Sequence, residues 1–258
     1  MAGSDLEVAL EAARAGAAQV ASGRDGPMQI DFKSATDPAT EIDYRSEQTI
    51  IEVLARHLPD DPVIGEERGG RLPDRGRVWL VDPLDGTTNF IHGFPWVSVS
   101  VALWIDNLPA VGVVLNPLTG EEYTATRGGG AHLNGSPLRV SSTDSLARAL
   151  VVTGFPYDPA ERIKICDSTF RRVLEKVQGI RRLGSAALDL CMVAQGRMDG
   201  YWEEDLSPWD MGAGVLIVSE AGGTVTGKSG HPLSSPEDGF VVATNGLIHR
   251  QMIETLSG

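Results

Sequence analysis

The segment that most constrains this chain is 79–95, with the sequence WLVDPLDGTTNFIHGFP. It places Asp82 and Asp85 three residues apart, at the end of an apolar stretch, 78–82, that is typical of a strand. A Gly86-Thr-Thr sequence follows at once. Asp-Pro and Asp-Gly pairs are common turn formers, so this motif alone would indicate little more than a turn. Its meaning depends on which other residues accompany it.

Two further acids stand far away in sequence, Glu66 in IGEE and Asp210 in SPWD. Taken singly, Glu66 fits a solvated loop and Asp210 a helix start. Together with Asp82 and Asp85 they supply the hard oxygen ligands that Mg²⁺ prefers. Two such ions, roughly 3.5–4 Å apart, can activate a water and stabilise a leaving oxygen, and we expect Asp82 to bridge them. The turn between the aspartates would leave the Leu84 carbonyl as another ligand.

Phosphate is the ligand that these residues predict beside the metal. If a helix begins at Gly86, Thr87 and Thr88, its unpaired amides would face an anion. The chain has a formal net charge of −13, which opposes binding to nucleic acid or to an anionic membrane as a main role. Bound divalent cations would compensate the acidic chain where it handles a phosphorylated substrate.

Length and composition indicate a self-sufficient fold. A chain of 258 residues can bury a substantial core as one large domain or two packed halves. Cys166 and Cys191 lack CxxC spacing, so we expect free, buried or half-buried thiols in a reducing cytoplasm. We find no signal-like amino terminus and no apolar run long enough for a bilayer, and therefore expect a cytoplasmic protein without a membrane partner.

Residue patterns divide the chain near 141–145 into an N-terminal α+β half, 1–145, and a C-terminal α/β half, 146–258. In the first half we expect a helix at 6–20, a loop carrying Lys33, and a second helix with Asp43 in its first turn. Its expected strands are 78–82, 96–104, 110–116 and 121–127, with antiparallel neighbours joined by tight turns. The second half is expected to contain strand 149–154, helices 159–177 and 185–195, strand 198–203, one helix from Ser207 through Val218, and strands near Thr224 and Phe240.

Aromatic residues around the main motif have a structural interpretation. Trp79, Phe90, Phe94 and Trp96 fall in strands and turns, which favours core and rim packing over a base-stacking surface. His92 is a lone histidine in a turn, and we expect it to be structural or solvated rather than a ligand or general base.

Several motifs in one order resemble the inositol monophosphatase family over nearly the whole chain. They are KS at 33–34, DPATEID, IGEE, DPLDGTTNF, GFPY, GSAALDL, WEE and SPWDMGAG. The resemblance implies a layered fold, a five-layer α-β-α-β-α sandwich of the kind shared with fructose-1,6-bisphosphatases. It also implies a homodimer, metals at the junction of the two halves, and inhibition by lithium.

The resemblance further implies a metal-binding set. Glu66, Asp82 and the Leu84 carbonyl would hold one Mg²⁺, while Asp82, Asp85 and Asp210 would hold a second. Glu66 would assist a third, so that two or three ions occupy each active site.

Catalytic and substrate roles are implied in the same way. Thr87 and Asp43 would orient and deprotonate the attacking water, with help from Glu66. Two alternatives stay open for Lys33, which either contacts the phosphate from its loop or simply lies on a mobile loop. Position 207 is serine where animal members carry histidine, whereas the GFPY and RRLGSAALDL forms are of bacterial type. The implied substrate contacts are Asp85, Gly86, Thr87, Thr88, Gly184, Ser185, Ala186, Glu203 and Asp210.

We therefore expect a Mg²⁺-dependent phosphomonoesterase that hydrolyses myo-inositol 1-phosphate or related polyol and sugar phosphates. Three alternative activities stay open, because the metal-binding motif recognises only the phosphate that is cleaved. They are fructose-1,6-bisphosphatase, histidinol-phosphatase and 3′-phosphoadenosine 5′-phosphate phosphatase. A non-enzymatic alternative is a regulatory protein that binds the transcription apparatus.

Overall fold

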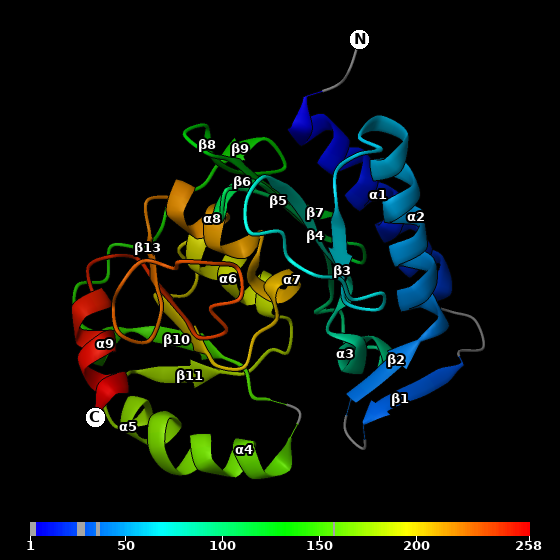
Figure 1. Cartoon of the computed structure of the whole chain (residues 1–258). Helices are drawn as coiled ribbons and strands as arrows, with labels where there is room; N and C mark the ends of the chain where they lie inside the picture. Colours follow the sequence, from blue (N-terminus) through cyan, green and yellow to red (C-terminus); the bar gives the residue numbers. More distant parts are fainter. Residues whose placement is uncertain (1–3, 25–28, 35–36, 157) are drawn as a thin grey trace.

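Five layers, in the order α-β-α-β-α, make up the structure, which is a computed structural model (Figure 1). It describes residues 4–24, 29–34, 37–156 and 158–258, without the side chains of residues 32–34, 37, 159, 166 and 167. The layered sandwich expected from the sequence is confirmed. Within the described residues, none of the helices is long and apolar enough to cross a membrane.

The first layer is a pair of helices, α1 (Asp5–Gly23) and α2 (Glu41–His57), which cover one face of the larger sheet (Figure 1). In sequence, a hairpin of β1 (Ile30–Ser34) and β2 (Asp37–Thr40) connects the two helices. Helix α2 begins with a capping box, in which Thr40 and Asp43 satisfy each other's backbone amides.

The larger sheet has seven strands in the order β3-β4-β5-β6-β7-β8-β9. Strand β3 runs parallel to β4 and the other neighbours are antiparallel. Alternation along β4 gives the sheet two apolar faces, because Trp79 and Val81 pack toward α1 and α2 while Val78 and Leu80 pack inward. The strands are β3 (Val63–Gly65), β4 (Arg77–Asp85), β5 (Ser98–Ile105), β6 (Leu108–Asn116), β7 (Glu121–Thr126), β8 (Gly130–Leu133) and β9 (Ser136–Pro137).

Helices α6 (Ala186–Ala194), α7 (Pro208–Met211) and α8 (Gly214–Glu220) form the middle layer between the two sheets (Figure 1). Helix α6 is apolar on nearly every side, and residues 187–194 are all buried. This is the pattern expected of a helix that has a sheet on each side. Cys191 is a buried free thiol in this layer, as predicted.

The smaller sheet has five strands in the order β11-β10-β12-β14-β13. It is mixed, since β10 pairs in parallel with β11 and β12 whereas β14 pairs antiparallel with β12 and β13. Its strands are β10 (Leu150–Thr153), β11 (Gly179–Arg181), β12 (Gly200–Glu203), β13 (Thr224–Thr226) and β14 (Val241–Thr244). The outer helical segments are η1 (Leu146–Arg148), α4 (Pro159–Ile165), a π-helix η2 (Cys166–Phe170), α5 (Arg171–Leu174) and α9 (His249–Ser257).

Three local expectations were wrong. Lys33 lies in β1 rather than in a loop, because the backbone of 30–34 pairs with β2, and its side chain lies outside the described residues. The helix expected from Ser207 through Val218 is broken between α7 and α8. Segment 159–177 is helical only to Leu174 and contains the π-helical turn η2. Residue patterns also missed β1, β2, β3, β8, β9, β11 and α9.

A tertiary hydrogen bond lies at the break between α7 and α8. The indole Nε1 of Trp104, a fully buried side chain of β5, donates to the carbonyl of Gly212 at 3.0 Å. Gly212 and Ala213 keep helical backbone angles, with φ/ψ of −55°/−39° and −84°/−44°, so the interruption is local.

Replacing Trp104 by Phe should lower the free energy of unfolding by about 1–3 kcal/mol, because the buried Gly212 carbonyl loses its donor. Urea unfolding followed by circular dichroism measures the change. The control is Leu108→Ala, an exposed side chain at the start of β6 that should cost less than about 0.5 kcal/mol. Equal effects of the two substitutions would contradict the role given to the indole.

Candidate active site

A bulge at the end of β4 places the two aspartates of the main motif on one face of the sheet. Asp82 pairs with Ser100 and Asp85 pairs with Ser98, so β4 carries one residue more than β5 across this interval. Ser98 and Ser100 are two residues apart and share a face, and directly opposed partners share it with them. The Asp-Pro-Leu-Asp sequence therefore turns the chain and also places both aspartates on the same face of the sheet.

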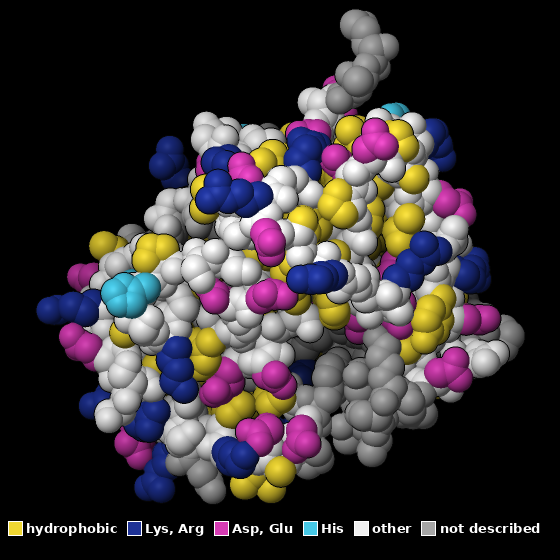
Figure 2. All heavy atoms as spheres, viewed as in Figure 1, with side chains coloured by type: hydrophobic (Ala, Val, Ile, Leu, Met, Phe, Trp, Pro, Cys, Tyr) yellow, Lys and Arg dark blue, Asp and Glu magenta, His cyan; other side chains and the backbone are white. Residues whose placement is uncertain are grey.

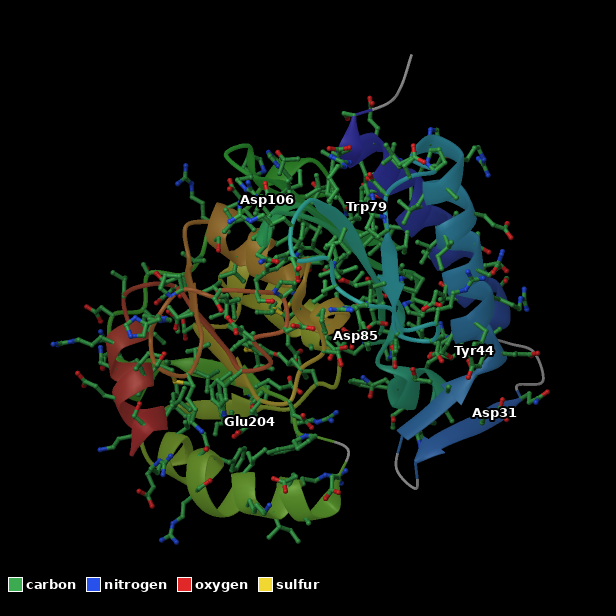
Figure 3. All side chains as sticks on the ribbon, viewed as in Figure 1. Asp31, Tyr44, Trp79, Asp85, Asp106 and Glu204 are labelled. Atoms are coloured by element: carbon green, nitrogen blue, oxygen red, sulfur yellow. The ribbon has the colours of Figure 1, made fainter. Side chains whose placement is uncertain are left out.

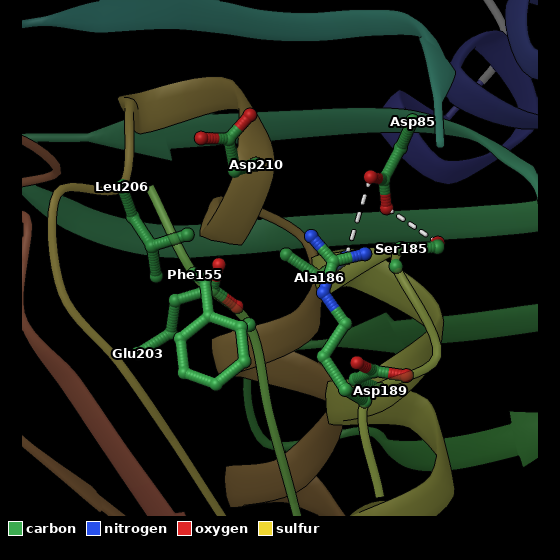
Figure 4. A pocket seen from close by; sticks show the side chains of 11 residues that line it. Asp85, Phe155, Ser185, Ala186, Asp189, Glu203, Leu206 and Asp210 are labelled. Atoms are coloured by element: carbon green, nitrogen blue, oxygen red, sulfur yellow. Dashed lines mark hydrogen bonds between the residues drawn. The ribbon is translucent and has the colours of Figure 1, made fainter. Parts of the chain in front are cut away.

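Asp85 joins the larger sheet to the middle helical layer. Its Oδ2 accepts hydrogen bonds from Ser185 Oγ at 2.5 Å and from the Ala187 amide at 2.9 Å, and its Oδ1 accepts from the Ala186 amide at 3.3 Å (Figure 4). The carboxylate thus lies at the amino end of α6, where the helix dipole favours a negative charge. Figure 3 shows Asp85 near the centre of the molecule, between the two halves. Burial raises its pKa, while the bond from Ser185 opposes the rise.

Thr87 and Asp43 form a buried hydrogen-bonded pair, as expected of a water-activating couple. Thr87 Oγ1 lies 2.9 Å from Asp43 Oδ1 and 3.0 Å from the Leu84 carbonyl oxygen. The other Asp43 oxygen accepts from the amide and hydroxyl of Thr40, at 2.8 and 2.5 Å. Asp43 is therefore both a helix-capping residue and a partner of Thr87. Burial raises its pKa, and these hydrogen bonds oppose the rise.

Gly86 makes the short helix α3 (Thr87–Ile91) possible. Its φ is 91°, and a Cβ there would stand 2.9 Å from the Trp96 carbonyl and 3.0 Å from that of Gly184. Asn89, which the motif analysis passed over, bonds the same two segments through Nδ2, at 2.8 Å from the Trp96 carbonyl and 2.8 Å from the Leu183 carbonyl. The Gly86 turn is thereby held against the segment that precedes α6.

Glu66 and Asp210 approach Asp82 from different segments. Glu66 follows β3, and its amide donates to the Val81 carbonyl at 3.2 Å. Asp210 lies in the first turn of α7 and accepts from the Ser207 amide at 2.7 Å. Burial raises the pKa of Asp82 far above its usual range, and Glu66, Asp85 and Asp210 raise it further. The same forces act on Asp210, for which burial is largest and Glu66 next.

These carboxylates are chemically suited to hold divalent cations. A cluster of mutually repelling acids in a low-dielectric region requires either protons or metal ions to compensate it. Over the described residues, no group of three or more His, Cys, Asp or Glu side chains is already placed to hold an ion. The donor set therefore fits hard cations by chemistry and charge, and the ligand assignments stay predictions.

A pocket extends from these acids to the smaller sheet (Figure 4). Glu203, at the end of β12, lines it and accepts a hydrogen bond from Tyr201 Oη at 2.7 Å. Burial raises the pKa of Glu203 to about 7, against the opposing effects of Tyr201 and Arg182. The lining residues are Asp85, Gly154, Phe155, Arg182, Gly184, Ser185, Ala186, Asp189, Glu203, Leu206 and Asp210.

Residue patterns alone did not identify Asp189, Arg182, Phe155 or Leu206 as lining residues. Asp189 is buried, and its Oδ1 accepts from Trp96 Nε1 at 3.0 Å. Its spacing of four from Ser185 puts the two on one helix face, which is a signal that could have found it. The other three converge only through the tertiary fold.

The exposure of the remaining residues of this segment agrees with the solvated or structural role expected of His92 and with the core and rim packing expected of the aromatic residues. Thr88 is exposed in the first turn of α3, and His92 is exposed beyond its end. Trp79 and Phe90 are core residues, whereas 48% of Phe94 is exposed at the rim.

The sequence as a whole matches known proteins. The sequence profile of the inositol monophosphatase family matches residues 3–258. This chain belongs to the inositol monophosphatase family. An inositol-1-monophosphatase from Synechocystis sp. is 44% identical over 258 residues, covering 98% of this chain and 88% of that protein. A protein named Nus factor SuhB from Pseudomonas aeruginosa is 42% identical over 260 residues, covering 97% of this chain and 95% of that protein.

A solved structure matches the fold of this family member closely. The extragenic suppressor protein suhB from Bartonella henselae superposes with a TM-score of 0.91 at 36% identity, and the match covers 98% of each chain. The family resemblance and the fold inferred from the motifs are therefore confirmed. Family membership supports a phosphatase.

The pKa of Glu203 predicts a pH-dependent stability for this inositol monophosphatase family member in the presence of chelator. Its folded-state value, about 7 against a usual 4.5, means that the folded state holds this proton more tightly than the unfolded chain. The resulting stabilisation is complete below about pH 4.5 and is lost as pH rises through about 7. Glu203→Gln lacks this titration. Between pH 4.5 and 7.5 the wild-type free energy of unfolding should fall relative to Glu203→Gln by on the order of 2 kcal/mol.

Urea titrations at several pH values measure this difference. Tyr201→Phe is the matched variant, because it removes the hydrogen bond that lowers the Glu203 pKa and should move the transition to higher pH. A wild-type minus Glu203→Gln difference that stays constant over the range would contradict the assignment.

Proposed function

We propose that this protein is a Mg²⁺-dependent phosphomonoesterase that hydrolyses myo-inositol 1-phosphate and related polyol or sugar phosphates. One observation carries the proposal. Glu66, Asp85 and Asp210, from three separate segments, all raise the pKa of the buried Asp82, which burial already raises, next to the buried Thr87–Asp43 pair. Family membership supports the same reaction class.

Glu66, Asp82 and the Leu84 carbonyl would hold one cation, and Asp82, Asp85 and Asp210 would hold another. Glu66 would share a third. When bound, these ions would supply Lewis-acid stabilisation of the phosphoryl charge. The Leu84 carbonyl oxygen lies 3.0 Å from Thr87 Oγ1, and its two lone pairs can serve as a cation ligand when the hydroxyl proton is directed to Asp43.

The chain itself would orient the attacking water. Thr87 Oγ1 donates toward Asp43 Oδ1, so its own lone pairs are directed away from that carboxylate and can accept a hydrogen bond from water. The proton would pass through the hydroxyl to Asp43, whose raised pKa suits it to receive one. Glu66, from the segment that follows β3, would assist in activating the water.

Substrate would lie between the Gly86 turn and the pocket. Amides and hydroxyls of Gly86, Thr87 and Thr88 would contact the phosphate. Gly184, Ser185, Ala186 and Glu203, together with Asp85 and Asp210, would contact the alcohol. A carboxyl such as Glu203 accepts hydrogen bonds from hydroxyls when ionised, which favours a polyol. Lys33 is proposed as an additional phosphate contact.

The pocket lining narrows the range of substrates. Acids outnumber the single arginine around it, which disfavours a second phosphate group. Basic and acidic side chains are also mixed on the face shown in Figure 2 rather than sorted into a basic surface. Fructose 1,6-bisphosphate, histidinol phosphate and 3′-phosphoadenosine 5′-phosphate are the competing substrates. We also propose a cytoplasmic homodimer that is inhibited by lithium.

The first test is phosphate release from inositol 1-phosphate and the three competing substrates, with Mg²⁺ and with chelator. We expect the highest kcat/KM on inositol 1-phosphate. Asp82→Asn should lower kcat by at least about a hundredfold, because it disturbs both proposed ions. Asp60→Asn, at an exposed position after α2, is the control. Near wild-type turnover by Asp82→Asn would show that Asp82 does not bridge the two proposed ions.

Thr87 provides a second test. Thr87→Val keeps the shape but loses the hydroxyl, and should lower kcat by about 10²–10⁴-fold. Thr87→Ser keeps the hydroxyl and should retain most of the rate. If the valine variant were as active as the serine variant at saturating Mg²⁺, the proton route through Oγ1 would be excluded.

A second candidate function is contact with the transcription apparatus. It is favoured by the name of the Pseudomonas aeruginosa relative, Nus factor SuhB, at 42% identity. Absence of turnover on all four substrates, together with recovery of RNA polymerase in a pull-down from the native host, would put this role first.

A further inference from the structure

Glu47 is a buried carboxylate that has no part in the proposed reaction. It lies on α2, one turn after Asp43, and only 1% of it is exposed. Glutamate is seldom buried to this extent, because removing a carboxylate from water is costly unless it is paired. Its placement therefore indicates a specific partner.

The partner is the backbone on both sides of Glu66. Glu47 Oε2 accepts a hydrogen bond from the Glu67 amide at 2.9 Å. On the other side, a Cβ on Gly65 would stand 2.2 Å from the same oxygen, so the missing side chain lets the carboxylate approach. Arg68 adds a contact, with Nε 3.9 Å from Glu47 Oε1.

The segment held in this way is a tight turn that carries the proposed ligand. The Gly69 amide donates to the Gly65 carbonyl at 2.9 Å, which closes the turn, and the Glu66 amide is tied to Val81 of β4. Glu47 Oε1 is buried without a hydrogen-bond partner. The Arg68 amide and guanidinium are its remaining polar neighbours, so the contacts of this buried carboxylate are with the turn itself.

We propose that Glu47 is a positioning residue that anchors the 65–69 turn on α2 and so holds Glu66 toward Asp82 and Asp210. This inference rests on the proposed metal-dependent function. It is the reach of the carboxylate to the Glu67 amide that matters, not its charge. Glutamine keeps that reach and an acceptor oxygen, whereas aspartate keeps the charge but falls short by one methylene group.

The test compares Glu47→Gln, Glu47→Asp and Glu47→Met with wild type and with Glu52→Gln, an exposed acid on the same helix. Three quantities are measured: hydrogen exchange at the Glu67 amide in metal-free protein, Mn²⁺ affinity by electron paramagnetic resonance titration, and the Mg²⁺ concentration for half-maximal phosphate release. Urea unfolding shows whether each variant is folded.

We expect Glu47→Asp and Glu47→Met to exchange faster at Glu67 and to bind Mn²⁺ about tenfold more weakly. Their kcat at saturating Mg²⁺ should stay within about twofold of wild type. Glu47→Gln and Glu52→Gln should resemble wild type in all three measurements. Because Gln and Asp are both conservative, this ordering can be read even if Glu47→Met fails to fold.

Two outcomes would overturn the inference. Unchanged exchange in Glu47→Asp would show that the turn is not anchored by this carboxylate. The reverse order of Mn²⁺ affinity, with Asp near wild type and Gln weakened, would show that charge rather than reach is what matters. If wild-type protein bound no Mn²⁺ and released no phosphate, the proposed function would fall and the metal part of this inference with it. The exchange result would still decide the anchoring.

Discussion

The carboxylate of Asp85 is the contact on which the arrangement of the site depends. It ends strand β4 and accepts hydrogen bonds from Ser185 and two backbone amides at the start of α6. One side chain thereby joins the larger sheet to the middle helical layer, and it brings a proposed metal ligand and the proposed substrate contacts of α6 to the same place. An anion at a helix amino terminus is stabilised electrostatically, so the junction favours the ionised carboxylate that a metal requires.

Several acids at this site have two roles. Asp43 and Asp210 accept the backbone amides that begin α2 and α7, which restricts their side chains to a single orientation. The same orientation turns Asp43 toward Thr87 and places Asp210 near Asp82. Helix capping thus pre-positions the reactive groups, whereas the mutual repulsion of the cluster lowers stability in the metal-free protein. Bound cations would relieve that repulsion.

Features that depend on neighbouring residues or on spaced motifs were predictable from the sequence, whereas features that depend on contacts between distant segments were not. Strands β4 to β7 of the larger sheet, the start of α2, the turn at Gly86 and the family were all accessible, since each depends on neighbouring residues or on spaced motifs. The break between α7 and α8 was not, and at that point the Gly212 carbonyl accepts a hydrogen bond from Trp104, over a hundred residues away in sequence. Nor was the position of Lys33 in β1, because the partner strand β2, with the sequence DPAT, is not rich in strand-forming residues.

The sequence by itself determined the chemistry: which carboxylates and hydroxyls are present, which of them start helices, and which family the chain resembles. Only the tertiary structure decided how they meet. Asp189 lines the pocket and accepts a hydrogen bond from Trp96, Glu203 is half-buried beside Tyr201, and Glu47 accepts the Glu67 amide in the turn that carries Glu66. The physical reason is burial. Desolvation and long-range hydrogen bonds, which set both the pKa values and the orientations at this site, arise only when segments distant in sequence exclude water together.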